Sequence, residues 1–293
     1  MNVEKLVYGL YPKSNELRLH INRWEKGTIP DSSLNDTIID EKNSLYKVYN
    51  DYNIVHTDPL FNWYDIFRPL ALIIDNMELG SLTRFKETNT FYRMPIVNEI
   101  NDIIINPAGF SPLNEEPPLP LYLKDDNFNA FLPSPLSFYR MSQVALEYKD
   151  FEKKLLNIYS KILNIFKVNE VVLYDPLSYD SNDIIDITPL TDKFIVKLVT
   201  TGKLYKDNIK GKPYSIISDY SNSNLEISGE LSRVPGLKLI DGYNTKMEDI
   251  NEINNIINNL GVDNLIVSHR EYFDFLPRII ADKKLSLMSK IGD

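Results

Sequence analysis

The sequence predicts an α/β fold consisting of a single eight-fold (β/α) barrel of the TIM type. Two observations favour this fold. About eight short apolar runs alternate with segments of helical periodicity, and the length of 293 residues is typical of such a barrel. No repeat, linker or boundary signal divides the chain, so one domain is expected over residues 1–293.

The first half of the chain begins with the apolar run KLVYGLY, which Pro12 ends. Ser14 is a suitable N-cap for the next segment, and Gly27 is a suitable stop. The expected elements of this half are strand 5–11, helix 14–27, a helix from Ser32 or Ser33 to Asn50, strand 53–56, helix 69–77 and strand 101–106.

The second half repeats this alternation of strand and helix. We expect one or two strands over 122–132, helices 136–146 and 148–166, strand 170–174, helix 192–200, strands 214–218 and 237–240, helix 247–260, strand 265–267 and helix 275–288. Two segments show no clear period. They are expected to form irregular arms at about 79–101 and at the Pro-rich stretch 107–120.

Composition excludes several function classes. The net charge of −9, without a dense Lys/Arg stripe, argues against a nucleic-acid partner. No run approaches the about 18 apolar residues of a membrane span, and no secretory signal is visible, so a cytoplasmic protein is expected. The chain has no cysteine, which removes disulfides, thiolate zinc sites and cysteine nucleophiles.

The stretch from Asn53 to Pro95 is unusually rich in aromatic and guanidinium side chains. Such groups build pocket floors and fix carboxylates or phosphates. The alternative is structural: the rings plug the barrel end, and the arginines pair with Asp58, Asp65 and Glu87. The candidate ligand-binding residues in this stretch are Trp63, Asp65, Arg68, Arg84, Asn89, Tyr92 and Arg93.

Polar residues follow several predicted strands, namely Asp58, Asp175, Asp219, Asp241 and His269. In a barrel the carboxyl ends of the strands form the functional face, so these side chains are expected to converge. We expect no metal site in this chain. The alternative is a His/Asp/Asp site made of Asp219, Asp241 and His269, against the simpler role of Asp as a helix cap.

Four segments carry a family resemblance. Residues 8–18 with Trp24-Glu25-Lys26-Gly27 resemble an opening G-F-P-R…R-E-L-K…Y-W-x-G, and residues 61–65 resemble F-x-W-Y-D. Residues 240–244 resemble V-D-G-R-N, and residues 265–285 resemble the final strand and closing helix. Together they resemble the N-terminal-type, zinc-less barrel of the cobalamin-independent methionine synthase family, here as a stand-alone chain.

The resemblance implies a function and its residues. In that family the R-E-L-K segment helps to hold the methylfolate tail. It matches Asn15, Glu16, Leu17 and Arg18 here, and Asn15 in place of the first Arg fits a methyl carrier other than a polyglutamyl folate. The family's other barrel binds homocysteine on a zinc ion held by His, Cys, Glu and Cys. Its catalytic Glu falls near Leu60, and its D-E-P survives only as Asp175-Pro176.

The expected function is therefore that of an accessory subunit in methyl transfer to homocysteine. The implied partners are a zinc-bearing catalytic methionine synthase barrel and a methyl-pterin or other methyl carrier. No cofactor is expected in this chain, and zinc is expected on the partner. Two alternatives stay open. One is a self-sufficient barrel methyltransferase with a cysteine-free metal site, and the other is a non-catalytic module that binds a pterin or a corrinoid protein.

Overall fold

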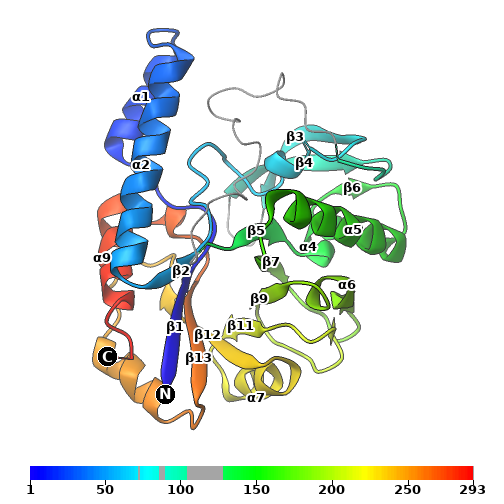
Figure 1. Cartoon of the computed structure of the whole chain (residues 1–293), viewed down its shortest axis with the longest axis vertical. Helices are drawn as coiled ribbons and strands as arrows, with labels where there is room; N and C mark the ends of the chain where they lie inside the picture. Colours follow the sequence, from blue (N-terminus) through cyan, green and yellow to red (C-terminus); the bar gives the residue numbers. More distant parts are fainter. Residues whose placement is uncertain (72, 86–89, 104–127, 293) are drawn as a thin grey trace.

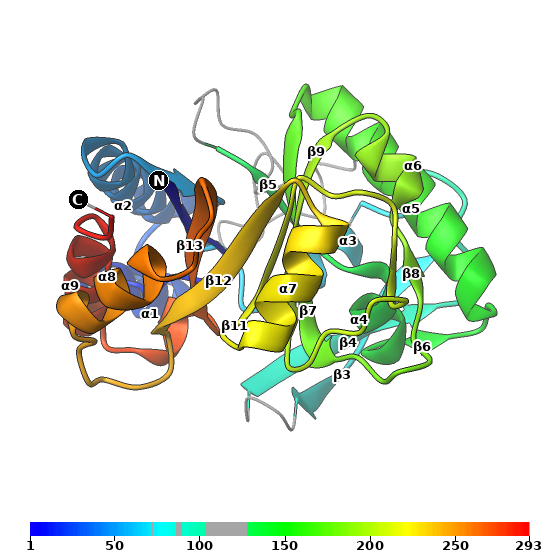
Figure 2. The same cartoon turned by 90° about the horizontal axis from the view of Figure 1, so that it is seen from below.

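The computed structural model describes residues 1–71, 73–85, 90–103 and 128–292. Its centre is a curled eight-stranded sheet in which every neighbouring pair of strands is parallel, in the order β2-β1-β13-β12-β11-β9-β7-β5 (Figures 1 and 2). The strands are β1 (Asn2–Val7), β2 (Ile54–His56), β5 (Ala130–Pro133), β7 (Glu170–Ser178), β9 (Ile195–Thr201), β11 (Ser215–Asp219), β12 (Val234–Asp241) and β13 (Asn264–Arg270).

The two edge strands of this sheet, β2 and β5, approach one another. An isolated parallel bridge joins His56 to Phe128, and the Asn129 N–H donates to the His56 carbonyl oxygen at 2.8 Å. The α/β class and the parallel sheet are confirmed. The sheet has the form of a half-barrel, and a single closed eight-fold barrel stays a prediction.

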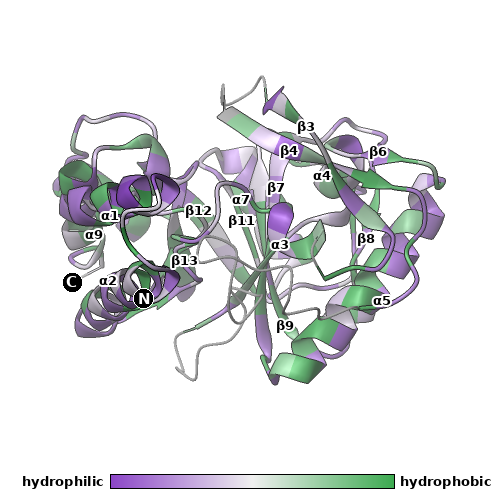
Figure 3. Cartoon of the chain, turned by 90° about the horizontal axis from the view of Figure 1, so that it is seen from above, coloured by the Kyte–Doolittle hydropathy of each residue, from purple (hydrophilic) through white to green (hydrophobic). Residues whose placement is uncertain are grey.

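Helices cover the outside of the curled sheet. Four of them, α1 (Asn15–Glu25), α2 (Asp31–Asp51), α8 (Ile250–Asn258) and α9 (Arg278–Met288), lie together on one side in Figure 2. The others are α3 (Arg68–Ala71), α4 (Pro135–Arg140), α5 (Tyr148–Phe166), α6 (Thr188–Thr191) and α7 (Asn222–Leu231). In Figure 3 the ribbon of α5 alternates between hydrophilic and hydrophobic residues, which is typical of a helix packed on one face.

Buried side chains form two hydrophobic clusters, and β13 contributes to both. Leu265 and Val267 pack with the helices α1, α2, α8 and α9, whereas Ile266 belongs to the other cluster. This division follows from the alternation of side chains along a strand. The functional end of the sheet is then the edge where the carboxyl ends of the parallel strands meet.

Local signals predicted α1 well. The Ser14 hydroxyl accepts a hydrogen bond from the Leu17 N–H at 3.0 Å, so Ser14 is the N-cap, and Gly27 follows the helix with φ of 69°. Leu17 and Ile21 are buried, as their spacing predicts. The long helix α5 also lies where its periodicity predicts, over residues 148–166.

The expected helix 192–200 is wrong, because most of this segment is the strand β9. The segment IVKLVTT lies between β7 and β11, with Val196, Leu198 and Val199 fully buried. A continuous apolar run is typical of a strand buried on both faces, but period alone does not separate it from a buried helix.

The irregular arm expected at 79–101 is also wrong over most of its length. The strands β3 (Met77–Phe85) and β4 (Thr90–Val97) pair in antiparallel fashion, and we call this pair the hairpin; β6 (Gln143–Val144) pairs with β4. Leu79, Leu82 and Phe91 are apolar but exposed, which hides the period of two. The helix expected over 69–77 is limited to the single turn of α3.

Three other expectations fall partly or wholly on residues outside those described. The arm at 107–120 lies there entirely. Of the strand expected over 101–106, the structure describes only a bridge from Ile103 to Ile74, and of the strand over 122–132 it describes β5.

Two short strands, β8 (Ile185–Asp186) and β10 (Ile209–Lys210), form a separate pair. Among the described helices, none combines the length and apolarity that crossing a bilayer requires.

Candidate functional site

An aromatic cavity lies at the carboxyl ends of the strands. It has a volume of about 80 Å³, and loops that follow β1, β2 and β13 meet around it beside the carboxyl half of β7. The hairpin of β3 and β4 closes one side with Phe85, Phe91 and Tyr92. We call this space the aromatic cavity. Its other aromatic side chains are Tyr64, Phe67, Tyr174, Tyr272 and Phe275, and its two acids are Asp65 and Asp274.

Asp65 connects the loop after β2 to the hairpin. Its Oδ1 accepts hydrogen bonds from the N–H groups of Phe67 at 3.0 Å and Arg68 at 2.8 Å, and its Oδ2 accepts one from the Arg93 N–H at 3.2 Å. The Arg68 guanidinium pairs with it at 3.1 Å. Burial raises the pKa of the Asp65 carboxyl, and these hydrogen bonds and Arg68 partly oppose the rise. Asp65 therefore holds the cavity wall in place.

The other candidates from this stretch do not all meet. Tyr92 lines the aromatic cavity, and its hydroxyl donates to the Met141 carbonyl oxygen at 3.0 Å; Trp63 is buried in the same hydrophobic cluster. Arg84 and Arg93 are exposed on the hairpin. Asn89 lies outside the described residues. The structural alternative is confirmed for Arg68, which pairs with Asp65.

Charged side chains stand at the rim of the aromatic cavity. Partial desolvation raises the pKa of Asp274, and the positive charges of Lys13 and Arg18 oppose that rise. The Lys13 ammonium lies 5.2 Å from the centre of the Tyr64 ring. Of the four residues carried over from the family's tail-binding segment, Asn15, Glu16 and Arg18 are exposed and Leu17 is buried in the core. Arg18 is thus the one whose charge reaches the cavity rim.

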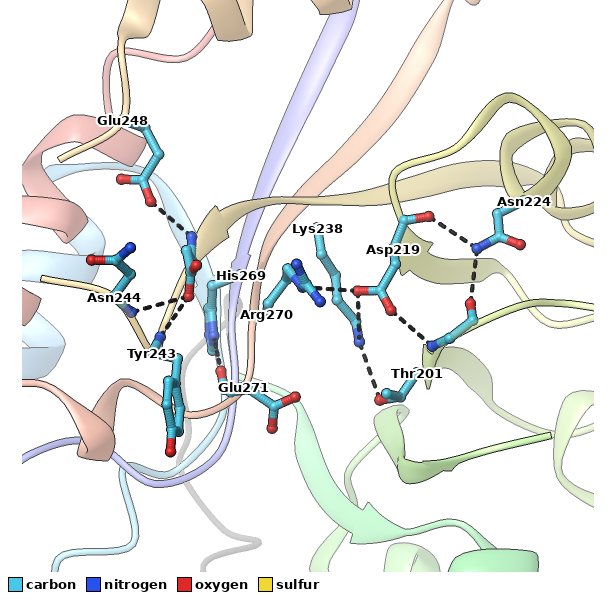
Figure 4. A network of polar contacts seen from close by, with 12 residues as sticks. Thr201, Asp219, Asn224, Lys238, Tyr243, Asn244, Glu248, His269, Arg270 and Glu271 are labelled. Atoms are coloured by element: carbon cyan, nitrogen blue, oxygen red, sulfur yellow. Dashed lines mark hydrogen bonds and ion pairs between the residues drawn. The ribbon is translucent and has the colours of Figure 1, made fainter. Parts of the chain in front are cut away.

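A cluster of polar side chains, next to the aromatic cavity, lies at the carboxyl ends of β9, β11, β12 and β13 (Figure 4). Asp219 is its centre: its carboxylate accepts a hydrogen bond from the Gly202 N–H at 2.8 Å and lies 3.2 Å from Arg270 Nε and 3.8 Å from Lys238 Nζ. Lys238 Nζ also donates to the Thr201 hydroxyl at 3.4 Å. We call Thr201, Asp219, Lys238, Arg270 and Glu271 the strand-end cluster.

Glu271 completes the strand-end cluster immediately after β13. Its backbone has φ of 52°, a left-handed conformation that is uncommon for residues other than glycine and that concentrates at functional sites. Burial raises the pKa of its carboxyl, Asp219 adds to the rise, and Lys238, Arg270 and a hydrogen bond with Tyr174 oppose it. Tyr174 also lines the aromatic cavity, so the two features adjoin.

Both ring nitrogens of His269 form hydrogen bonds within the protein. Its Nε2 accepts a hydrogen bond from the Tyr8 N–H at 3.2 Å, so Nδ1 carries the proton and donates to the Glu271 carbonyl oxygen at 2.6 Å. Its ring stacks between Tyr8 and Phe273, with centroid distances of 4.4 and 4.2 Å. Burial lowers the pKa of His269 to about 3. The imidazole is therefore neutral and has no nitrogen left for a metal ion.

The alternative metal site made of Asp219, Asp241 and His269 has no support in the geometry. The Asp241 carboxylate accepts hydrogen bonds from the N–H groups of Tyr243 at 2.8 Å and Asn244 at 3.1 Å (Figure 4). Within the described ranges, no group of three His, Cys, Asp or Glu side chains has the arrangement of a metal site. These residues do not fit the tetrahedral sulfur and nitrogen donor set of zinc.

The remaining strand-end acids also have structural roles. The Asp58 carboxylate pairs with Lys42 at 2.9 Å and accepts from the Tyr46 hydroxyl at 3.0 Å. The fully buried Asp175 accepts hydrogen bonds from the hydroxyl groups of Ser137 and Tyr179. The sequence therefore predicted acids at the strand ends, but it missed Lys238, Arg270 and Glu271. The signal for Lys238 is a single charge within the apolar run 237–240.

The fold and these two features define a class of protein: an α/β protein with a curled parallel sheet and its polar and aromatic groups at the strand ends. No family model and no curated protein matches the chain.

Two solved structures share the fold. One is described as the "Putative Vitamin-B12 Independent Methionine Synthase" from Listeria monocytogenes, with a TM-score of 0.62, 14% identity, and coverage of 97% of this chain and 95% of that chain. The other is a B12-independent methionine synthase from Shewanella sp. W3-18-1 in complex with selenomethionine, with a TM-score of 0.62, 11% identity, and coverage of 99% and 96%. At these identities the likeness establishes the fold.

Proposed function

We propose that this chain is an accessory barrel in methyl transfer to homocysteine, acting with a separate zinc-bearing barrel and holding the methyl carrier. In this proposal the curled sheet is a complete TIM-type barrel, closed through the bridge from His56 to Phe128. One observation carries the proposal. The strand-end groups that could ligate zinc are used inside the protein, while an aromatic cavity adjoins them, with the Lys13 ammonium against its Tyr64 ring.

The chemistry of thiol methylation supports two separate barrels, one that activates homocysteine and one that holds the methyl carrier. Homocysteine needs a thiolate, and zinc forms one at neutral pH when thiolate and imidazole ligands hold it. This chain has no cysteine, and both nitrogens of His269 are hydrogen-bonded to the backbone. Zinc and homocysteine therefore belong on the partner in this proposal.

The aromatic cavity supports a role in holding the methyl carrier. Its many rings suit a flat heterocycle such as a pterin, because offset and edge contacts between rings are favourable. Lys13 and Arg18 at the rim suit an anionic tail. Arg18 is also the cation retained in the segment that resembles the family's tail-binding motif, so two independent observations converge on this residue.

The solved structures are consistent with methionine chemistry. Both are named as B12-independent methionine synthases, and one holds selenomethionine. The alignments cover 95% and 96% of those chains, so single chains of this size carry that name.

The decisive experiment combines this chain with a zinc barrel encoded by the same genome. Co-purification, together with faster methionine formation when both are present, is the expected result. Failure to associate, with no effect on methionine formation, would contradict the proposal. So would methylation of homocysteine by the isolated chain.

A matched pair of variants tests the carrier site. Arg18→Ala is expected to raise the KM for the methyl donor severalfold while the complex still forms. Arg23→Ala, an exposed arginine on the same helix, is the control and is expected to leave the KM unchanged. Equal effects of the two substitutions would remove Arg18 from the carrier site.

The aromatic cavity also favours one alternative, a non-catalytic pterin-binding module. This alternative predicts that methyl-pterin raises the melting temperature of the isolated chain. It also predicts no change in methionine formation when the chain is added to any zinc barrel of the same cell.

A further inference from the structure

Lys238 is a buried lysine whose ammonium group is loosely held. Its side chain is 1% exposed, and its contacts among the described residues are Thr201 Oγ1 at 3.4 Å and an Asp219 carboxylate oxygen at 3.8 Å. Both distances exceed those of an ordinary charge-assisted hydrogen bond. Keeping a buried amine charged with such weak partners costs free energy, which suggests that Lys238 has a role other than a structural one.

Two other buried lysines show what a structural role looks like in this protein. Each has two oxygen partners within 3.1 Å. Lys197 Nζ lies 3.1 Å from Glu4 and 2.9 Å from Glu170, and Lys284 Nζ lies 2.6 Å from Glu248 and 2.9 Å from the Lys246 carbonyl oxygen. Lys238 differs from both in its contacts and in its place at the functional end of the sheet (Figure 4).

The chain geometry next to Lys238 is irregular. The pairing of β12 with β13 shifts register between Lys238 and Ile240, as in a β-bulge. Bulges are frequent beside active sites, where they re-aim a side chain. On the facing strand, β13 is followed by Glu271 in its left-handed conformation. Two backbone irregularities thus flank the same side chain.

The charges around Lys238 restrict what could bind there. The cations Lys238 and Arg270 face the carboxyl groups of Asp219 and Glu271, with Asp175 further away on β7. Two acids already balance the two cations, so an added anion is not favoured. Asp219 and Arg270 are partly exposed, with 22% and 56% of their side-chain surface open. The strand-end cluster is therefore open to solvent at Asp219 and Arg270, and the ligand inferred below would enter on that side.

We propose that Lys238 is an amine nucleophile that forms an imine with a small neutral aldehyde or ketone, and that Glu271 moves the protons. Burial lowers the pKa of Lys238, and the nearby Arg270 lowers it further, while Asp219 and Glu271 oppose this. Desolvation and a neighbouring cation are the two means by which proteins activate a lysine amine. The pKa of Glu271 is raised by burial, which favours the acid form that donates a proton.

The reaction is a condensation with loss of water. The lone pair of the neutral Lys238 amine attacks the carbonyl carbon, a C–N bond forms, and the carbonyl π electrons move to oxygen. Glu271 transfers a proton from the nitrogen to that oxygen to give a carbinolamine. It then protonates the hydroxyl group, which leaves as water while the nitrogen lone pair forms the C=N bond. The inference does not depend on the proposed accessory role.

Reductive trapping tests this inference on the whole chain. The protein is incubated at pH 7 with dihydroxyacetone, a neutral ketone, and cyanoborohydride, and the labelled lysines are mapped by peptide mass spectrometry. Lys206 is the internal reference, since it is exposed and its pKa is raised by Glu230. Lys238 is expected to label at least about tenfold more than Lys206, because burial lowers the pKa of Lys238 and leaves more of it as the neutral amine. Equal or weaker labelling of Lys238 overturns the proposal.

Three variants separate chemistry from folding. Lys238→Arg keeps the cation and is expected to lose the label at this position, while Glu271→Gln is expected to slow labelling of Lys238 at least about tenfold. Glu252→Gln, on the exposed face of α8, is the control and should label as the parent does. Unchanged labelling in Glu271→Gln removes that residue from the mechanism. If Lys238→Arg fails to fold, the ratio of Lys238 to Lys206 in the parent protein decides the question. Preferential labelling by pyruvate, an anionic probe, would also contradict the assignment of a neutral ligand.

Discussion

Tyr8, which directly follows β1, and His269 of β13 join these two neighbouring strands of the sheet through three contacts. The Tyr8 N–H donates to His269 Nε2 at 3.2 Å, and the Tyr8 hydroxyl donates to the His269 carbonyl oxygen at 2.9 Å. Their rings stack with a centroid distance of 4.4 Å. The pair fixes one tautomer of the imidazole and directs both of its nitrogens to the backbone, which is why a residue predicted as a metal ligand holds the sheet together instead.

The stability of the protein should depend on pH through His269. Its pKa falls to about 3 in the folded state, from an ordinary value near 6.5, so the unfolded state binds more protons between these values. The stabilisation is therefore complete above pH 6.5 and is lost as the pH falls toward 3. From pH 7.5 to pH 5, His269 should reduce the free energy of unfolding by about 1–2 kcal/mol.

Urea unfolding of the parent and of His269→Gln at the two pH values measures this contribution. The difference between the two proteins is the quantity to compare, because buried acids with raised pKa values, such as Asp65 and Asp175, act in the opposite direction. The variant should be less stable at pH 7.5 and should lose less stability on acidification. Parallel pH profiles would contradict the lowered pKa of His269 in the folded state.

Asp65 should be essential for the wall of the aromatic cavity. Asp65→Asn replaces a carboxylate that serves three backbone N–H groups and Arg68 by an amide with a single acceptor oxygen. A loss of about 2–3 kcal/mol in the free energy of unfolding is expected. Asp207→Asn, at an exposed position, is the control and should lie within about 0.5 kcal/mol of the parent. A small effect of Asp65→Asn would show that the hairpin is held by other contacts.

Substitution of two glycines by alanine should change the free energy of unfolding in opposite directions. A Cβ at Gly242 would lie 2.3 Å from the Arg270 carbonyl oxygen and 3.0 Å from that of Glu271, and backbone atoms cannot move aside cheaply. Gly242→Ala is expected to cost about 1–3 kcal/mol and to disturb the strand-end cluster. A Cβ at Gly229, inside α7, meets nothing within 4 Å, so Gly229→Ala should stabilise by about 0.5–1 kcal/mol. Thermal unfolding of both variants checks the pair.

Lys197 should be a structural charge rather than a reactive one. Lys197→Met leaves Glu4 and Glu170 without their common partner, and a loss of about 2–3 kcal/mol is expected. This is below the usual cost of breaking a buried pair, because the two glutamates are 29% and 32% exposed. The double variant with Glu170→Gln should recover part of the loss in urea unfolding. An additive double variant would mean that the two residues do not interact.

Local sequence signals predicted most elements correctly where the deciding contacts are close in sequence. Ser14 caps α1 through the Leu17 N–H, and the buried face of α5 follows its helical period. The errors arose where partners are distant. β9 is a strand because β7 and β11 lie on either side of it, and β3 and β4 are strands because they pair with each other. Propensity is a weak guide when tertiary pairing decides.

The candidate site was predicted only in part. Asp65 and Tyr92 both line the aromatic cavity, while Arg84 and Arg93 lie exposed on the hairpin, and ligand binding by any of them stays a prediction. Lys238 and Glu271 were missed, because nothing in the neighbouring sequence shows that their strands place them together. Charge and burial of a side chain depend on what packs against it, which a linear pattern does not contain.

The sequence by itself determined the class of fold, the order of most elements and the lack of any thiol, since these depend on composition and short-range periodicity. The tertiary structure alone decided which of the polar residues are used up in holding strands together and which are left loosely held. The physical reason is that the pairing of β1 with β13 brings residues from opposite ends of the chain, such as Tyr8 and His269, within hydrogen-bonding distance. The desolvation and the charge partners of each side chain are set by these contacts and exist only in the folded protein.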